Sequence, residues 1–278
     1  MSLYLIAEIG INHNGSEELA KLMIRAAAEA GFDAVKFQKR TIEKVYSKEL
    51  LDSPRESPWG TTQRDQKKAL EFSRRQYEAI DRYCAEVNIA WSASAWDLDS
   101  QDFIADFAPL FNKLASPMLG NKPLLRKIAS EGKRTFISTG MSTIAEIDDV
   151  VDLFSQAGCP FELMHCNSTY PLPDDQANLL VIPMLRDRYG CNVGYSGHET
   201  SLIKVCVAAV ALGATSIERH ITLNRAMYGS DQAASIETAH LHEFVAAVRA
   251  VPDILGNGVK LITDTELPAR KKLRIEVE

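Results

Sequence analysis

Two of the six histidines in this 278-residue chain stand at the ends of similar short segments. "GYSGHE" carries His198 and "IERHIT" carries His220, and each segment begins apolar and finishes on polar groups. Two imidazoles that converge, with water and other oxygen ligands, suit a divalent metal such as Mn²⁺, Co²⁺ or Zn²⁺. The alternative is that each histidine is a hydrogen-bonded residue of the core. The choice depends on whether the elements that carry them are neighbours.

Two lysines, Lys36 in "AVKFQ" and Lys113 in "FNKLAS", lie inside segments that are otherwise largely apolar. A buried ammonium group is costly unless it is paired. The functional interpretation is that both lysines face an anionic ligand. The structural alternative is an ion pair with Glu8 or Glu218.

Hydroxyl side chains recur at the same kind of position, at the ends of apolar segments. Lysines combined with hydroxyls form a suitable cradle for phosphate and carboxylate groups. Each serine alone would indicate a turn or a helix cap, so only the whole set predicts a site. The serines in question are Ser94, Ser116, Ser138 and Ser196.

The elements that must position these residues form a repeating pattern. Eight short apolar runs of strand length alternate with segments of helical period. This pattern predicts a single (β/α)8 TIM barrel over residues 1–278, in which functional residues lie at the carboxyl ends of the strands. A doubly wound open sheet is the alternative, but it often has a glycine-rich loop after its first strand, and "EIGINHNG" is not GxGxxG. The predicted strands are residues 4–10, 34–38, 89–94, 111–116, 134–139, 161–166, 192–197 and 216–221.

The segments between the strands carry helix signals. Ser16 is expected to cap the first helix and Gly31 to end it. Further helices are expected at residues 143–158, 201–213 and 237–251. Residues 39–70 are too long for a simple turn, so we expect a lid or a binding loop there.

Composition excludes several classes of protein. The net charge of −6 argues against a general nucleic-acid binder. No apolar run approaches the ~20 residues that a membrane span needs, and the N-terminus lacks the features of a signal peptide. An odd number of cysteines without CxxC spacing indicates reduced thiols and a cytoplasmic location. We expect the cysteines to be small core residues; they are Cys84, Cys159, Cys166, Cys191 and Cys206.

The remaining histidines are less informative. His13 and His165 stay ambiguous between site and core. His240 and His242 lie in a predicted helix, away from any strand end, and are expected at the surface or in the core.

Seven segments, in order and at family spacing from about residue 4 to residue 236, resemble the sialic acid synthase family. The segments are "AEIGINHNG", "AVKFQK", "STGMST", "HCNSTYPLP", "GYSGHE", "IERHIT" and "GSDQAAS". The resemblance implies a barrel enzyme that condenses phosphoenolpyruvate with an open-chain amino sugar, typically N-acetylmannosamine. The products would be a 3-deoxy-2-keto sugar acid and phosphate. A homodimer is a further expectation.

The resemblance also implies roles for individual residues. His198 and His220 would bind the divalent metal, Mn²⁺ or Mg²⁺. Glu8, Lys36, Lys113 and Asp231 are expected to be the catalytic residues. Phosphoenolpyruvate would be held by both lysines and by the hydroxyls of Ser94, Ser116, Ser138, Ser168 and Ser196. Glu8, Gln38, Tyr170 and Asp231 would face the sugar or assist proton transfer.

Three features depart from the family pattern. Met118, in "KLASPMLGN", stands where the family usually has an acidic residue that contacts the sugar. The usual C-terminal antifreeze-like domain and the usual N-terminal extension are both expected to be absent. We therefore expect N-acetylmannosamine to be at most a poor substrate and the preferred acceptor to be a different aldose. The alternative is that the loop at residues 39–70 or a partner chain supplies the missing contacts.

Two other functions stay open from the sequence. One is a sugar-phosphate-binding barrel without catalysis. The other is a metal-dependent aldolase or isomerase, which also uses two histidines but does not account for the seven segments.

Overall fold

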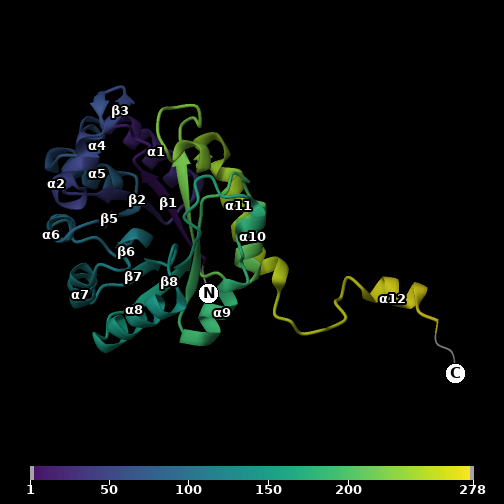
Figure 1. The fold of residues 1–278 in the computed structure, drawn as a ribbon. Coiled ribbons are helices and arrows are strands. Elements are labelled where there is room, and N and C mark those ends of the chain that lie inside the picture. Colours follow the sequence, from purple (N-terminus) through teal and green to yellow (C-terminus); the bar gives the residue numbers. More distant parts are fainter. Residues whose placement is uncertain (1–2, 276–278) are drawn as a thin grey trace.

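The protein folds as a closed barrel of eight parallel strands, and the computed structural model describes residues 3–275 (Figure 1). Neighbouring strands pair in sequence order, and β1 pairs with β10 from Tyr4↔Ser216 to Glu8↔His220, which closes the sheet. The predicted (β/α)8 architecture is therefore confirmed. The barrel strands are β1 (Tyr4–Gly10), β2 (Ala34–Lys39), β5 (Ala90–Ala95), β6 (Asn112–Leu114), β7 (Thr135–Ser138), β8 (Phe161–His165), β9 (Val193–Gly197) and β10 (Ser216–Thr222).

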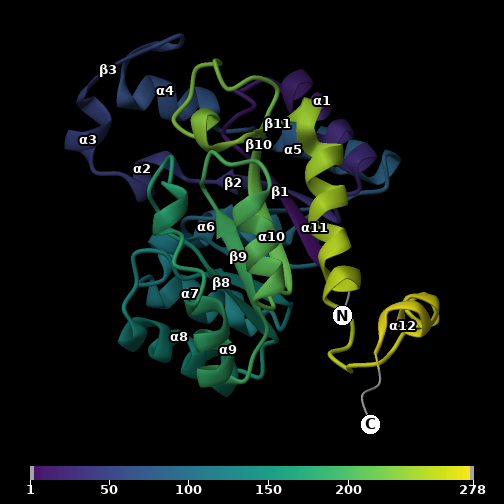
Figure 2. The same cartoon turned by 90° about the vertical axis from the view of Figure 1, so that its right-hand side faces the viewer.

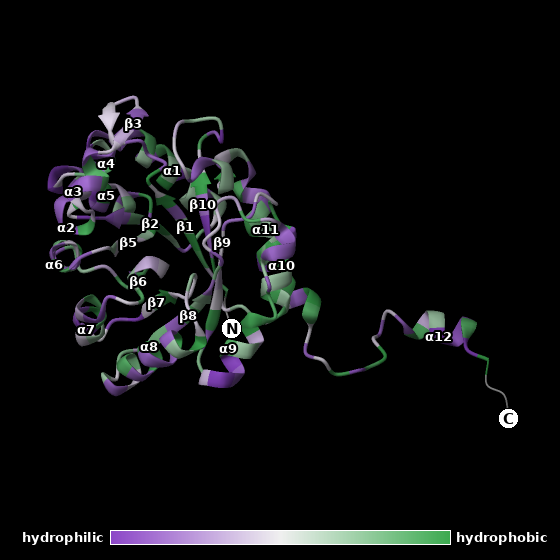
Figure 3. Ribbon diagram, viewed as in Figure 1, coloured by the Kyte–Doolittle hydropathy of each residue, from purple (hydrophilic) through white to green (hydrophobic). Residues whose placement is uncertain are grey.

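A layer of helices covers the outside of the barrel (Figures 1 and 2). Figure 3 shows mixed hydrophilic and hydrophobic segments along these helices. The main core lies between their apolar faces and the outer face of the strands. The covering helices are α1 (Glu17–Ala30), α5 (Arg74–Glu86), α6 (Leu98–Ala105), α7 (Lys122–Ser130), α8 (Ile144–Gln156), α9 (Val181–Tyr189), α10 (Lys204–Ala211) and α11 (Leu241–Leu255).

The first helix shows how local sequence sets the boundaries. The Ser16 hydroxyl accepts a hydrogen bond from the Leu19 amide, which satisfies one of the free N–H groups at the start of α1. Gly31 adopts a left-handed conformation with φ of 91°, as expected where a helix ends on glycine. Both predicted boundaries are confirmed.

Other boundaries differ from the predictions. The helix expected at residues 201–213 is confined to α10, and the helix expected at 237–251 begins later and includes Pro252. β6 ends at Leu114 because Ser116 begins the 3₁₀ turn η1 (Ser116–Met118), which contains Pro117.

The long insertion after β2 folds into small elements of its own above one side of the barrel (Figure 1). Its hairpin packs onto α4 and contributes little apolar surface, in keeping with its hydrophilic colouring in Figure 3. The elements are α2 (Ile42–Val45), α3 (Lys48–Asp52), β3 (Pro54–Ser57), β4 (Gly60–Thr62) and α4 (Gln63–Leu70).

A second, smaller apolar cluster fills one end of the barrel interior. Ile6, Ala34, Phe111, Phe136 and Met164 form this cluster, and all five are buried. Successive residues of a strand point to opposite faces, so the residues two and four positions further along each strand also point inward. The interior above the cluster is therefore lined by the next inward-facing residues, which are polar.

All five cysteines are free thiols, and none of the described helices is long and apolar enough to cross a membrane. Cys84, Cys159 and Cys206 belong to the buried core, and Cys191 packs against it half-buried. Cys166 is also buried, and it lines a cavity as well.

Candidate active site

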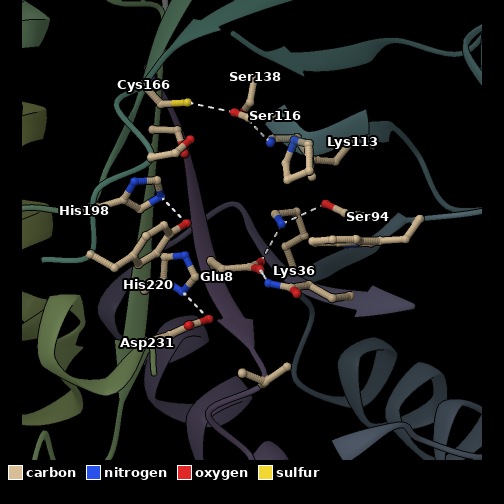
Figure 4. A pocket seen from close by; sticks show the side chains of 18 of the residues that line it. Glu8, Lys36, Ser94, Lys113, Ser116, Ser138, Cys166, His198, His220 and Asp231 are labelled. Carbon is tan, nitrogen blue, oxygen red and sulfur yellow. Dashed lines mark hydrogen bonds and ion pairs between the residues drawn. The ribbon is translucent and has the colours of Figure 1, made fainter. Parts of the chain in front are cut away.

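The carboxyl end of the barrel holds a cavity of about 400 Å³ that brings together all the residues predicted to act in catalysis, substrate binding or metal binding (Figure 4). The cavity is lined by residues from all eight barrel strands or from the loops that follow them. The predicted residues that line it are Glu8, Lys36, Gln38, Ser94, Lys113, Ser116, Ser138, Ser168, Tyr170, Ser196, His198, His220 and Asp231.

The alternation of strand side chains explains why these positions converge. On β1, Ile6 lies in the internal apolar cluster and Glu8, two positions later, lines the cavity. On β2, Ala34 lies in the cluster and Lys36 and Gln38 line the cavity. On each of these strands, the residue in the apolar cluster and the first residue that lines the cavity are two positions apart.

Both buried lysines are paired with carboxylates. Lys36 Nζ lies 2.7 Å from Glu8 Oε2 and 3.6 Å from Glu218 Oε1. Lys113 Nζ lies 3.7 Å from Glu218 Oε1. The structural ion pairs that the sequence left open therefore exist. They line the cavity, so they do not remove the lysines from a ligand.

Each lysine also contacts a serine. Lys36 Nζ donates to Ser94 Oγ at 3.0 Å, and Lys113 Nζ donates to Ser138 Oγ at 2.6 Å. A serine hydroxyl that accepts from an ammonium group keeps its own proton free to donate. The two pairs therefore present four groups able to donate hydrogen bonds to an anion.

Protonation differs between the two buried carboxyl groups. Burial raises the pKa of Glu8 to about 7, an effect that Lys36 only partly offsets. Burial also opposes ionisation of Glu218, but Lys113 and Lys36 together lower its pKa. Burial lowers the pKa of Lys113, whereas the two carboxylates beside Lys36 raise its pKa against the effect of burial. Glu8 can thus exchange a proton near neutral pH, while Glu218 stays charged.

Three further side chains converge on Gly140. Ser116 Oγ accepts from the Gly140 amide at 3.0 Å and lies 3.1 Å from Cys166 Sγ. A Cβ atom at position 140 would come within 2.4 Å of Ser168 Oγ and 2.8 Å of the other two side chains. Only glycine allows this approach, which accounts for the glycine in "STGMST".

The two histidines lie side by side, His198 directly after β9 and His220 on β10. β9 pairs with β10, and the imidazole centroids are 5.5 Å apart. His198 Nδ1 lies 2.6 Å from the Asn167 carbonyl oxygen, to which it must donate. Its Nε2 therefore carries a lone pair, which accepts from the Tyr170 hydroxyl at 2.7 Å. Burial and the neighbouring His220 lower the pKa of His198 to about 4, so this imidazole is neutral at neutral pH.

Some polar atoms around the histidines have no hydrogen-bond partner. Within the described residues, His220 Nδ1 and Glu218 Oε2 are buried without one. Asp231 Oδ2 is 3.8 Å from His220 Nδ1, and burial lowers the pKa of His220. Among residues 3–275, no three side chains of His, Cys, Asp or Glu already form a metal-binding group. His198 and His220 together fit a metal that takes two imidazole nitrogens and fills its other coordination positions with water or substrate oxygen.

Several lining residues were not predicted. Arg40 and Trp96 follow β2 and β5 directly, whereas Tyr46 and Lys67 come from the insertion. The length of residues 39–70 was the only sequence signal for the latter two.

Met118 was wrongly expected to face the sugar. It is not among the residues that line the cavity, because the turn η1 directs Pro117 toward the cavity while Met118 packs against the hydrophobic core. Met118 therefore gives no geometric reason to expect a different acceptor sugar.

The other histidines have structural positions. His13 stacks on Phe72 with ring centroids 3.9 Å apart, and burial lowers its pKa to about 3. His165 Nε2 lies 2.8 Å from the Ala177 carbonyl oxygen. His240 and His242 are exposed.

Comparison with known proteins agrees with this arrangement. Residues 23–260 match the model of the NeuB family. The chain is 40% identical to the human N-acetylneuraminate-9-phosphate synthase over 97% of its own length and 76% of that protein. It is 34% identical to the Campylobacter jejuni N,N'-diacetyllegionaminic acid synthase over 94% of its length and 80% of that protein.

A solved structure is also similar. The sialic acid synthetase of Leptospira borgpetersenii superposes with a TM-score of 0.87 at 29% identity, covering 99% of this chain and 94% of that one. The resemblance to sialic acid synthases is thereby confirmed. The chain belongs to the NeuB family, whose members are synthases that form a carbon–carbon bond.

Proposed function

We propose that this protein condenses phosphoenolpyruvate with an open-chain N-acylated amino sugar, giving a sialic-acid-like 3-deoxy-2-keto sugar acid and phosphate. The observation that carries the proposal is the convergence, in one cavity, of two lysine–serine pairs with two neutral histidines. The first set suits an anionic substrate and the second suits a polarised aldehyde.

The inner part of the cavity is the proposed site for phosphoenolpyruvate. Lys36 and Lys113 neutralise its carboxylate and phosphate, and Ser94 and Ser138 donate hydrogen bonds to the same oxygens. Ser116, Ser168 and Ser196 complete the hydroxyl lining. Charged hydrogen bonds of this kind are strong because the site is shielded from water.

The chemical steps balance with one water molecule. C3 of phosphoenolpyruvate attacks the aldehyde carbon, which forms the new carbon–carbon bond and leaves C2 electron-poor. Water adds at C2 and gives up a proton, and the aldehyde oxygen becomes a hydroxyl by taking up a proton. The bond between C2 and the phosphate oxygen then breaks while the C2 hydroxyl passes its proton to the leaving phosphate, which releases phosphate and leaves the keto group.

Several residues would orient the sugar and handle protons. Glu8 holds a proton near neutral pH because of its raised pKa, so it is suited to exchange one with the aldehyde oxygen. Its Oε1 accepts from Gln38 Nε2 at 2.9 Å, which fixes its orientation. Tyr170 and Asp231 face the same region from the loops after β8 and β10.

His198 and His220 are the proposed ligands for a divalent cation such as Mn²⁺ or Mg²⁺. Such a cation would act as a Lewis acid on the aldehyde oxygen. The lone pair of His198 Nε2 and the unpartnered, buried His220 Nδ1 support this assignment.

The test is release of inorganic phosphate from phosphoenolpyruvate with Mn²⁺ and a panel of amino sugars. We expect phosphate and a keto acid in equal amounts, both dependent on sugar. The His198→Ala variant should keep its circular dichroism spectrum but lose bound Mn²⁺ and turnover. A protein that binds phosphoenolpyruvate and sugar without releasing phosphate would be a binding barrel, and the proposal would be wrong. Release of pyruvate from a keto sugar acid alone would instead indicate an aldolase.

A further inference from the structure

A group of cations lies at the outer side of the cavity, away from the two buried lysine–serine pairs. Arg40 and Lys67 line the main cavity, and both also line an adjoining cavity of about 120 Å³, where Arg55 joins them. Arg40 follows β2, Arg55 lies on the hairpin strand β3, and Lys67 lies on α4. We call these three residues the outer cation cluster.

The outer cation cluster is only partly neutralised by the described part of the chain. Glu71 is the one carboxylate that contacts it, at 3.4 Å from Arg40 Nη1, and Glu71 also pairs with Lys39 Nζ at 3.1 Å. Within residues 3–275, Arg55 and Lys67 have no carboxylate oxygen within 4.0 Å of their charged nitrogens. Burial and the charges of Arg40 and Arg55 lower the pKa of Lys67, as expected where like charges gather.

Three buried N–H donors around these cavities also lack partners. In the described structure, Arg40 Nε, Arg55 Nε and Trp96 Nε1 are buried without a hydrogen-bond acceptor. Trp96 lines the main cavity, and the Arg40 guanidinium lies over its ring at 4.3 Å from the centroid. Buried unpaired donors are costly, so their presence around two adjoining cavities that share Arg40 indicates a ligand that supplies acceptor oxygens.

The chemistry of the missing ligand follows from charge and position. A phosphate monoester carries a charge of about −1.5 to −2 at pH 7 and three acceptor oxygens, which suits three cations and three free donors. The phosphate of phosphoenolpyruvate is already matched by Lys36, Lys113 and their serines. The second cavity contains none of those residues and neither of the two cavity histidines, so it would receive the end of the sugar remote from the aldehyde.

We propose that the outer cation cluster of Arg40, Arg55 and Lys67 binds a phosphate ester on the terminal carbon of the acceptor sugar. This inference rests on the proposed function and specifies its substrate class, a phosphorylated N-acylated hexosamine. The terminal phosphate takes no part in the bond-forming steps, so it remains on the product.

The experiment compares kcat/KM for N-acetylmannosamine 6-phosphate and N-acetylmannosamine, with saturating phosphoenolpyruvate, Mn²⁺ and a blank that lacks phosphoenolpyruvate. Saturation with phosphoenolpyruvate keeps the inner anion site occupied. We expect the phosphorylated sugar to be preferred by about tenfold or more, and the Lys67→Met and Arg55→Met variants each to lower this ratio by about tenfold, equivalent to about 1.4 kcal/mol.

Lys68→Met is the matched control. Lys68 is the next residue on α4, but it is exposed and pairs with Glu43 at 2.9 Å on the outer surface. This variant should keep the wild-type ratio. Equal use of the two sugars by the wild type, or an unchanged ratio in Lys67→Met and Arg55→Met, would overturn the inference.

Two other outcomes are distinguishable. No phosphate release with any sugar would refute the proposed function itself. If inorganic phosphate competes with the acceptor in the wild type but not in Lys67→Met, and the phosphorylated sugar is not preferred, the cluster is an exit site for released phosphate. That result would also overturn the inference about the acceptor.

Discussion

The Tyr170 hydroxyl occupies the one ring nitrogen of His198 that is free to bind a metal. It donates to Nε2 at 2.7 Å, and the two rings stack with centroids 4.0 Å apart. The same tyrosine meets His220 edge-on at 5.7 Å between centroids. A metal that binds His198 must therefore displace this hydrogen bond.

Removing that hydroxyl should strengthen metal binding. A hydrogen bond of this kind contributes about 0.5–1.5 kcal/mol, so Tyr170→Phe should bind Mn²⁺ up to about tenfold more tightly in the absence of substrates. Electron paramagnetic resonance titration of free Mn²⁺ measures this directly. The control is Tyr189→Phe, whose hydroxyl donates to Asp148 on the surface. Weaker Mn²⁺ binding by Tyr170→Phe would mean that the hydroxyl helps to hold the metal.

Glu8 should make phosphoenolpyruvate binding depend on pH. Its pKa of about 7 means that the carboxyl is largely neutral at pH 6 and largely ionised at pH 8. The ionised form lies 2.7 Å from Lys36 Nζ and competes with the substrate for that charge. Glu8 therefore weakens binding of the anion only as the pH rises through 7.

The Glu8→Gln variant removes this competition. We expect it to bind phosphoenolpyruvate about tenfold more tightly than the wild type at pH 8, a difference of about 1.4 kcal/mol, and equally well at pH 6. The substrate phosphate, with a pKa near about 6, ionises equally in both experiments and cancels in the comparison. Calorimetry without metal gives the dissociation constants. Equal affinities at pH 8 would show that Glu8 is not ionised next to Lys36.

Sequence reasoning identified the inner part of the cavity but not its outer wall. Lys36, His198 and His220 were predictable because a charged or polar group at the end of a buried strand has few structural uses. Arg55 and Lys67 were not, because their positions depend on packing of the hairpin on α4 and of α4 on α2 and α3. Met118 was misplaced because a 3₁₀ turn, and not a longer strand, follows Leu114.

Strand β10 carries one row of residues for the cavity and another for structural support. Glu218 and His220 face the cavity, whereas Arg219 points outward and is fully buried. Arg219 Nη1 lies 2.6 Å from Glu199 Oε1, and its Nη2 donates to the Glu199 carbonyl oxygen at 2.6 Å. This pair ties β10 to the residue that follows His198.

The neighbouring glycine fits the same arrangement. A Cβ atom on Gly197 would come within 2.4 Å of Glu199 Oε2 and 2.7 Å of the Tyr195 ring. The motif "GYSGHE" therefore combines His198, which points into the cavity, with Glu199, which points outward and pairs with Arg219. Ser196 and His198 of this motif were predictable from the sequence but Glu199 was not, because an arginine at an outward position gives no sign of its partner.

Breaking the buried ion pair between Arg219 and Glu199 should destabilise the barrel strongly. Arg219→Met leaves the buried Glu199 carboxylate without its cation, which typically costs about 3–5 kcal/mol. Arg188→Met is the matched control, because Arg188 pairs with Asp148 at the surface and should lose at most about 1 kcal/mol. Urea unfolding measures both. The double variant Arg219→Met/Glu199→Gln should recover part of the loss, and equal losses in the two single variants would contradict the argument.

At the level of elements, the barrel strands were predicted to within two residues because buried parallel strands are short, apolar and separated by helical segments. The hairpin of β3 and β4 was not predicted. Its residues, "PRES" and "GTT", show no apolar alternation, since it packs on α4 and not on the core.

The molecule as a whole divides into the packed barrel and an extended arm, defined as residues 256–275 (Figures 1 and 2). Every residue from 252 to 275 is exposed, including α12 (Leu267–Leu273). The hydrogen bonds of the arm join residues within it or in the turn just before it. The arm also presents apolar side chains to solvent, among them Leu261, Leu273 and Ile275. A homodimer stays a prediction.

Deleting residues 257–278 should leave the barrel as stable as before. Because the described arm buries nothing against the barrel, its loss should change the free energy of unfolding by no more than about 0.5 kcal/mol. At about 2–4 °C per kcal/mol, the thermal midpoint in dilute solution should shift by at most about 2 °C. Thermal unfolding at several concentrations, with light scattering on both chains, separates two outcomes. If the truncated chain has a lower midpoint than the full chain only at high concentration, and light scattering gives it a smaller molecular mass, the arm joins two subunits. A fall of many degrees at every concentration would contradict the prediction, because the arm would then have to stabilise the single barrel.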